Sequence, residues 1–246
     1  MVEYVNNIDH ARMNPLISKT GRLTAVGIVF ALCTTAASAQ TTTNYSYTFP
    51  VNQTVPDGNA SGLALTTNLA GMSGSISNVT ISLDITGGFN GDLYVYLDGP
   101  NGGFAVLLNR AGVTSGDAFG YSDTGFNVTF DDSAGYNNIH YYQNFGYTLN
   151  GGGQLTGSWS SDGRAIDPLS NPSTFATTQP TSLLDSFDGT DPNGTWSLFL
   201  ADLSGGGQST SANWRLDIVA VPEPSACTLL GIGILLWVWK RSNRPI

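Results

Sequence analysis

Residues 85–102 read ITGGFNGDLYVYLDGPNG, and they set the fold class of the chain. Apolar and polar side chains alternate between a Gly-Gly pair and a Pro-Asn-Gly turn, with Leu93, Val95 and Leu97 on one face. A period of two is the pattern of a strand that buries one side, and Gly/Pro clusters mark turns. The stretch predicts a half-buried β-strand between tight turns.

The same alternation recurs between residues 79 and 218, with glycine- and aspartate-rich turns between the runs. The further apolar rows are Val79, Ile81, Leu83 and Ile85; Phe126, Val128 and Phe130; Trp196, Leu198 and Leu200; and Trp214, Leu216 and Ile218. Several short strands separated by such turns predict an all-β fold, a β-sandwich or jelly roll.

Short motifs occur in a fixed order between about residues 50 and 219: Pro56-Asp57, Gly91-Asp92-Leu93 with Pro100-Asn101-Gly102, Gly194-Thr195-Trp196, and Trp214-Arg215-Leu216. This order resembles the P domain (Homo B domain) that follows the catalytic domain of subtilisin-like proprotein convertases. The resemblance implies a β jelly roll. The middle, 112–184, is longer and less typical, and an unrelated sandwich with similar turns is the competing interpretation.

These motifs suit structural roles. Gly91 permits a tight entry into its strand, Asp92 can accept hydrogen bonds from turn amides, and Trp196 and Trp214 supply large core surfaces. We expect the two tryptophans to be fold determinants and not ligand contacts.

The C-terminal 26 residues form a separate segment. Pro222-Glu223-Pro224 precedes fourteen uncharged residues, Ala226–Trp239, and then a basic cluster of Lys240, Arg241 and Arg244. A helix needs ~20 apolar residues for a full membrane crossing. However, the stretch is apolar on every face, and basic residues follow it as they do at a cytoplasmic flank. We expect a membrane-inserted helix.

This order of parts resembles the PEP-CTERM sorting signal of Gram-negative, exopolysaccharide-producing bacteria. The resemblance implies processing near Pro222, Glu223 and Pro224 by a membrane transpeptidase-like enzyme, exosortase. It also implies a protein exported through the inner membrane, anchored by its C-terminal helix, and then placed at the cell surface or outside the cell. A plain C-terminal anchor is the alternative.

The N-terminal segment predicts a signal-peptide helix over residues 1–39. Lys19 and Arg22 precede an apolar stretch over residues 23–37, and Ala37-Ser38-Ala39 provides a cleavage site between Ala39 and Gln40. Met13 is a candidate start that would shorten an unusually long leader. The predicted domains are therefore 1–39, 40–220 and 221–246.

Composition narrows the chemistry of the exported part. The two cysteines, Cys33 and Cys227, lie in the terminal segments, so the mature domain has no disulfide. Between residues 40 and 224, three arginines face fifteen aspartates and one glutamate, a net charge of −13. A domain with this negative net charge repels the phosphate backbone, which excludes nucleic acid as a partner.

The sequence favours a protein that is not an enzyme. His140 is the one histidine beyond the leader, no Gly-x-Ser-x-Gly elbow occurs, and no His-based zinc motif is found. Glycosidases use paired carboxylates, and such pairs usually include a glutamate that acts as the acid. The one glutamate between residues 40 and 224 is Glu223, which belongs to the sorting motif.

Two sets of residues are candidates for binding, each with a structural alternative. Asp92, Asp117, Asp131 and Asp132 could hold Ca²⁺, which prefers oxygen ligands, or could serve turns. Tyr141, Tyr142 and Trp159 could stack on sugar rings, or pack in a loop that covers a sheet.

Three functions follow. The first is a non-catalytic surface or extracellular-matrix protein that acts by binding, in a setting of exopolysaccharide, biofilm or other surface proteins implied by the tail. The second is a carbohydrate-binding module with a defined groove. The third is an unrecognised hydrolase.

Overall fold

The computed structural model describes residues 41–222 and 226–242. Gln40–Glu223 is one compact unit, and the helix α3 belongs to another. The strands of the first unit are β1 (Thr43–Thr54), β2 (Asn59–Leu69), β3 (Ser75–Gly87), β4 (Leu93–Asp98), β5 (Phe104–Asn109), β6 (Gly125–Phe130), β7 (Leu155–Trp159), β8 (Gly194–Asp202) and β9 (Ser209–Val221). Its helical turns are η1 (Asn90–Asp92), η2 (Pro100–Gly102), η3 (Ile139–Asn144), α2 (Pro172–Thr177) and η4 (Leu184–Phe187).

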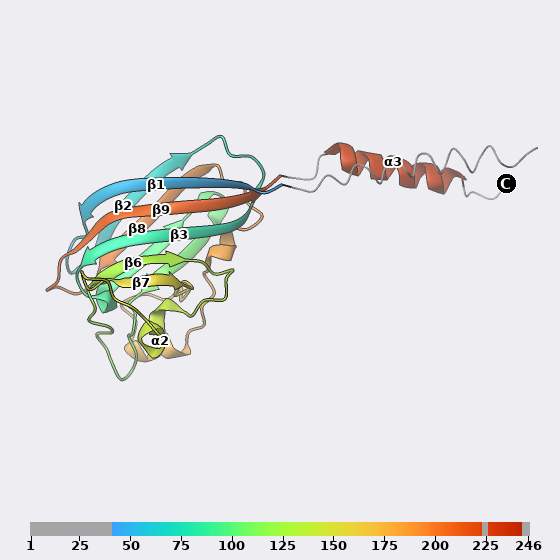
Figure 1. Cartoon of the computed structure of the whole chain (residues 1–246). Coiled ribbons are helices and arrows are strands. Elements are labelled where there is room, and N and C mark those ends of the chain that lie inside the picture. Colours follow the sequence, from blue (N-terminus) through green and yellow to red (C-terminus); the bar gives the residue numbers. More distant parts are fainter. Residues whose placement is uncertain (1–40, 223–225, 243–246) are drawn as a thin grey trace, which may run out of the picture. The chain divides into compact units, whose positions relative to one another are not determined.

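The strands form two sheets. One has the order β1-β9-β3-β6-β7, and the other has the order β2-β8-β4-β5. Figure 1 shows them as two layers. The strand pairs are antiparallel except β6 with β7, which is parallel. The prediction of an all-β sandwich is confirmed, and β9 runs one residue past the predicted boundary at 220.

The alternating rows supply the core, as expected. Ile81, Ile85, Val95, Leu198 and Leu216 are each fully buried. Their neighbours in sequence point to the opposite face, because successive side chains of a strand alternate. Both inner faces are therefore apolar, and they pack against each other between the sheets.

The two tryptophans are buried between the layers, as predicted. Trp196 donates its indole N–H to the Pro192 carbonyl at 3.0 Å, and Trp214 stacks on Phe49 with ring centroids 4.3 Å apart. The indole N–H of Trp196 is thus satisfied where the ring leaves water. The tight entry expected at Gly91 is also present, since a Cβ there would collide with the Phe119 carbonyl.

The long middle of the domain adds β6 and β7 to one side of the five-stranded sheet. Its remaining residues form irregular segments joined by the short η3 and α2 turns, seen below β7 in Figure 1. β7 is consequently the edge strand of that sheet.

In the second unit, α3 (Ala226–Ser242) is a helix of 17 residues. Lys240 and Arg241 lie in its last turn, and the Arg241 guanidinium lies 5.2 Å from the centre of the Trp237 ring. Among the helices that the structure describes, none is long and apolar enough to cross a membrane. The predicted signal peptide, the cleavage site at Ala39 and Gln40, and Glu223, Pro224 and Arg244 lie outside the described residues.

Candidate functional site

An open groove of about 360 Å³ lies beside β7, the edge strand of the larger sheet. Tyr136 and Tyr147 line it with exposed fractions of 45% and 39%. Asn137 and Ser158 add polar groups, and Trp159 completes the lining near the end of β7. The groove therefore combines accessible aromatic rings with hydrogen-bonding side chains, as sugar-binding surfaces do.

Backbone hydrogen bonds to the two ends of β7 hold the walls of this groove. On one side, Ser160 donates to the Asn137 carbonyl at 2.9 Å. On the other side, Thr156 donates to the Thr148 carbonyl, also at 2.9 Å. Between them lies Gly157, an exposed residue with a φ of +98° and no side chain to fill the space. The edge of the sheet thus stays open between the aromatic walls.

Tyr142, a candidate for stacking on a sugar or for packing in a covering loop, belongs to the core. It is fully buried, its hydroxyl donates to Asp123 at 2.7 Å, and it accepts from the side chain of Asn90 at 3.1 Å. Burial, followed by the hydrogen bond to Asp123, raises the pKa of Tyr142 well above its ordinary value. The residue cannot offer a ring face to a ligand.

Tyr141 and Trp159 also make contacts within the domain, which limits the ring surface that they could offer to a sugar. The guanidinium of Arg164 lies 5.1 Å from the centre of the Tyr141 ring, whose edge packs on His140. Trp159 is 5% exposed and donates its indole N–H to the Thr156 carbonyl at 3.0 Å. The aromatic rings that the groove exposes are Tyr136 and Tyr147, which were not among the three candidates chosen from the sequence.

Two of the four aspartates considered as calcium ligands serve their own turns. Asp117 accepts from the amides of Phe119 and Gly120, and Asp131 accepts from the amide and hydroxyl of Ser133. These are the local hydrogen bonds for which aspartate is favoured in turns. The structural alternative therefore accounts for both residues.

Asp132 joins segments that are distant in sequence. Its Oδ1 accepts from the Ser160 hydroxyl at 2.8 Å and the Ser161 amide at 2.7 Å, and its Oδ2 accepts from the Leu184 amide at 2.7 Å. Asp92, the fourth candidate, is 6% exposed in η1. Within residues 41–222 and 226–242, no three His, Cys, Asp or Glu side chains converge as metal ligands.

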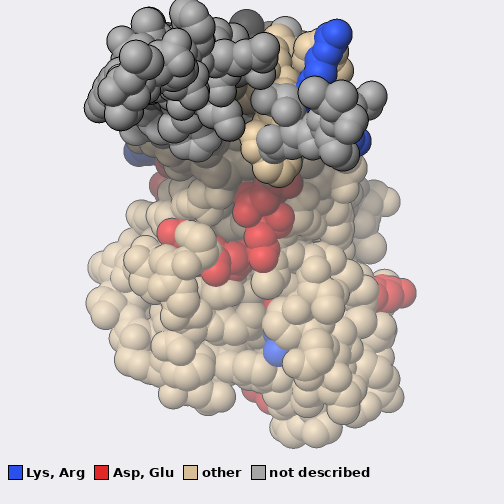
Figure 2. All heavy atoms as spheres, turned by 90° about the vertical axis from the view of Figure 1, so that its right-hand side faces the viewer, with Lys and Arg blue, Asp and Glu red and all other residues tan. Residues whose placement is uncertain are grey.

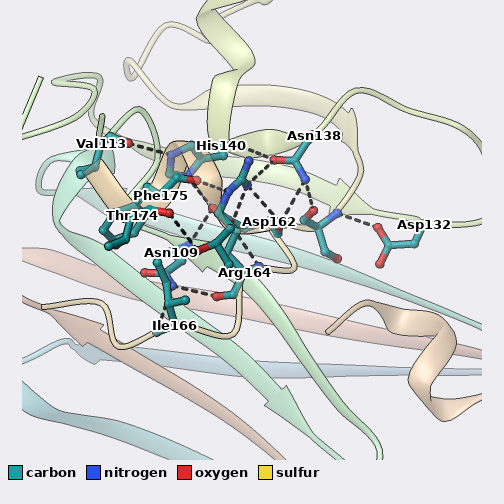
Figure 3. A network of polar contacts seen from close by, with 12 residues as sticks. Asn109, Val113, Asp132, Asn138, His140, Asp162, Arg164, Ile166, Thr174 and Phe175 are labelled. Carbon is teal, nitrogen blue, oxygen red and sulfur yellow. Dashed lines mark hydrogen bonds and ion pairs between the residues drawn. The ribbon is translucent and has the colours of Figure 1, made fainter. Parts of the chain in front are cut away.

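His140 lies in a buried polar network, shown in Figure 3. Its Nδ1 is 2.7 Å from Asp162 Oδ2, its Nε2 is 3.0 Å from the Val113 carbonyl, and its ring stacks on Phe175. On the other side, Arg164 Nη1 donates to Asp162 Oδ1 at 3.1 Å. His140 and Asp162 are both fully buried, so neither reaches a substrate in solution.

The same network fastens the long middle segment to β5. The Asn109 side-chain amide donates to the Arg164 carbonyl at 2.9 Å and to the Ile166 carbonyl at 3.1 Å. Arg164 Nε donates to the Phe175 carbonyl at 2.9 Å, just beyond the middle of α2. Sequence reasoning singled out His140 but missed Asp162 and Arg164, because no local pattern links them. The contacts give all three residues a structural role.

Carboxylates also gather on the face shown in Figure 2. Asp98, Asp185, Asp188 and Asp191 are exposed aspartates at the end of the sandwich where β8 begins. Partial burial, reinforced by neighbouring Asp185, raises the pKa of Asp188. These side chains give that end of the domain a negative surface, in keeping with the charge of the sequence.

No family model matches the chain, and no curated protein does. Two solved structures of a serine protease of Aeromonas sobria show a distant likeness. The complex of this protease with its chaperone shares 14% identity and a TM-score of 0.42 over 78% of this chain. The protease alone shares 12% identity and a TM-score of 0.40 over 77%. The chain spans 29% of the length of each.

Proposed function

We propose that the chain is an exported, non-catalytic protein of the cell surface or extracellular matrix, sorted through its C-terminal segment and acting by binding. The order of parts in the last 26 residues carries this proposal: the motif at 222–224, the uncharged stretch Ala226–Trp239, and the basic cluster after it. By its resemblance to the PEP-CTERM signal, the tail points to exosortase as the processing partner and to an exopolysaccharide-rich setting.

The location of the chain in the cell tests this sorting. We would place a tag in the domain between residues 40 and 220. The tagged chain would be expressed in an exosortase-containing Gram-negative bacterium and in the matching exosortase-deletion strain. The expected result is a shortened form outside the inner membrane in the first strain and a full-length, retained form in the second. The triple variant Pro222→Ala, Glu223→Ala, Pro224→Ala should be retained in both strains.

The control for that variant is Pro180→Ala, an exposed proline of the folded domain that should leave sorting unchanged. The same mass and the same location in both strains for the unaltered chain would refute exosortase sorting. A plain C-terminal anchor would give that result.

A second candidate function, carbohydrate binding at a defined site, is favoured by the groove beside β7. Tyr136 and Tyr147 present exposed rings on which sugar faces can stack, and Asn137 and Ser158 offer hydrogen-bonding groups beside them. The groove is lined mainly by neutral side chains. It therefore suits a neutral segment of polysaccharide better than a charged ligand.

Substitution of the exposed rings separates this candidate from general surface binding. Tyr136→Ala and Tyr147→Ala should each weaken exopolysaccharide binding measured by titration, with little change in melting temperature because both side chains are accessible. Phe119→Ala is the matched control, since Phe119 is 78% exposed and lies outside the groove lining. Equal losses in all three variants, or no loss in any, would rule out the groove.

A further inference from the structure

Three aspartates from three separate segments lie near the β8–β9 turn, at one end of the sandwich. Asp202 ends β8 and lies opposite Leu93 of β4, the residue that follows Asp92. The amide of Leu203 donates to the Asp92 carbonyl at 2.9 Å. The Gly206 amide, in the same turn, donates to Asp57 Oδ2 at 3.1 Å. The β8–β9 turn thus contacts all three segments, and the exposed Asp57 carboxylate accepts directly from it.

Asp202 is fully buried, and its two carboxylate oxygens differ. Oδ2 accepts from the Ser209 hydroxyl at 3.1 Å, whereas Oδ1 has no hydrogen-bond partner. Four buried side-chain oxygens in the described residues share that condition, and Asp202 Oδ1 is the one carboxylate oxygen among them. A buried carboxylate oxygen without a donor is strongly unfavourable, because it has lost its water and gained nothing.

The surroundings of Asp202 disfavour its negatively charged form. Burial raises its pKa to about 6, and the nearby carboxylates of Asp92 and Asp57 contribute to the rise. Burial likewise raises the pKa of Asp92, although Ser204 and Arg110 oppose the change. Burial therefore disfavours the charged form of both side chains.

Among the described residues, no basic side chain forms an ion pair with this site. The ion pairs of the described residues involve Asp162 and Asp217, and none includes Asp57, Asp92 or Asp202. Arg110, the nearest cation, donates instead to backbone carbonyls, with Nε on Gly91 and Nη2 on Ala118, both at 3.2 Å.

We propose that Asp202 and Asp92 together bind one calcium ion under the β8–β9 turn. Ca²⁺ accepts carboxylate, carbonyl, hydroxyl and water oxygens in irregular arrangements, so two carboxylates and the oxygens of the turn suffice as a set. Asp57 adds charge from a greater distance, because it does not complete a group of three ligands. With two carboxylates, the affinity belongs to the weak class of extracellular modules, Kd on the order of 10⁻⁴–10⁻³ M.

Calorimetric titration of the chelator-treated full chain with CaCl₂ at pH 7 tests the site. We expect one site in that affinity range and a melting temperature that rises with calcium concentration, since a ligand bound only by the folded state stabilises it. Asp202→Asn and Asp92→Asn should each weaken calcium binding by tenfold or more. Asp117→Asn, the same change at an exposed turn aspartate, should bind calcium as the unaltered chain does.

Two results would overturn the proposal. The first is an unaltered chain that gives no heat and no shift in melting temperature with Ca²⁺ but melts higher on acidification through pH 6, which would mean that the site holds a proton and not a metal. The second is unchanged calcium binding in both Asp202→Asn and Asp92→Asn. If Asp202→Asn does not fold, the titration of the unaltered chain and of Asp92→Asn still decides between these outcomes.

Discussion

Asp162 and Asp202 are both fully buried, yet the domain surrounds them in opposite ways. Asp162 contacts Arg164 and His140 and also accepts from the Asn109 amide. Asp202 accepts from the Ser209 hydroxyl, forms no ion pair, and has the carboxylates of Asp92 and Asp57 nearby. A buried charge is stable when it is paired and hydrogen-bonded. The comparison indicates that the fold supplies its own cation, Arg164, and further hydrogen-bond partners at Asp162, and leaves Asp202 to be neutralised by a proton or a metal ion.

The largest effect should come from removing the paired carboxylate. Asp162→Ala leaves the guanidinium of Arg164 and the ring of His140 buried without their partner, and such a loss typically destabilises by about 3–5 kcal/mol. Urea unfolding at pH 7 measures it. A loss below about 1 kcal/mol would mean that the network in Figure 3 contributes little to stability.

Asp202 should show the opposite behaviour with pH. Its folded pKa of about 6 lies above its ordinary value of 3.8, so the folded state binds the proton more tightly than the unfolded state does. In calcium-free buffer, this contribution to stability is present below pH 4 and is lost as the pH rises through 6. Asp202→Asn should flatten the curve between those values and raise stability at pH 7. An unchanged pH profile in the variant would assign the titration to another group.

Removal of the buried Tyr142 hydroxyl should have an intermediate effect on stability. Tyr142→Phe removes the hydroxyl between Asp123 and Asn90 while keeping the ring, so the Asn90 amide loses its acceptor. We expect a loss of about 1–3 kcal/mol in denaturant unfolding, with sugar binding unchanged because the ring is buried. Loss of sugar binding at unchanged stability would restore Tyr142 as a ligand residue.

The smallest effect should come from the exposed pair. Arg215 donates to Asp217 at 2.8 and 3.0 Å, but the Arg215 side chain is half exposed. Arg215→Ala should therefore change the unfolding free energy by less than about 1 kcal/mol, and less still in high salt. A larger change would show that an exposed ion pair of this domain can contribute as much to stability as a buried one.

Local pattern was enough to predict the strands but not the polar sites. Period-two rows such as Val79–Ile85 are visible in sequence because each strand repeats its own inner face. Asp202 looks like an ordinary residue before a turn, and its burial comes from pairing with β2 and β4, which lie more than 100 residues earlier. The pair at His140 and Asp162 likewise spans an irregular segment with no period to follow.

The candidate ligands show the same limit. Asp131 and Asp132 were grouped because they are adjacent, yet their carboxylates bond to separate parts of the domain. For Tyr142 the sequence left sugar stacking and packing as alternatives, whereas the three-residue spacing from Ile139 puts both side chains on the buried side of the turn η3. That spacing was the one available signal, and it is weak in a segment rich in asparagine and glycine.

Binding is the central claim, and titration of the purified Gln40–Glu223 unit against the producing bacterium's own exopolysaccharide tests it most directly. This unit contains all nine strands and the hydrophobic core, and we expect it to fold alone. The account predicts saturable binding in Ca²⁺ that Tyr136→Ala and Tyr147→Ala weaken. Absence of binding, both with Ca²⁺ and with chelator, would contradict exopolysaccharide as the partner of this domain.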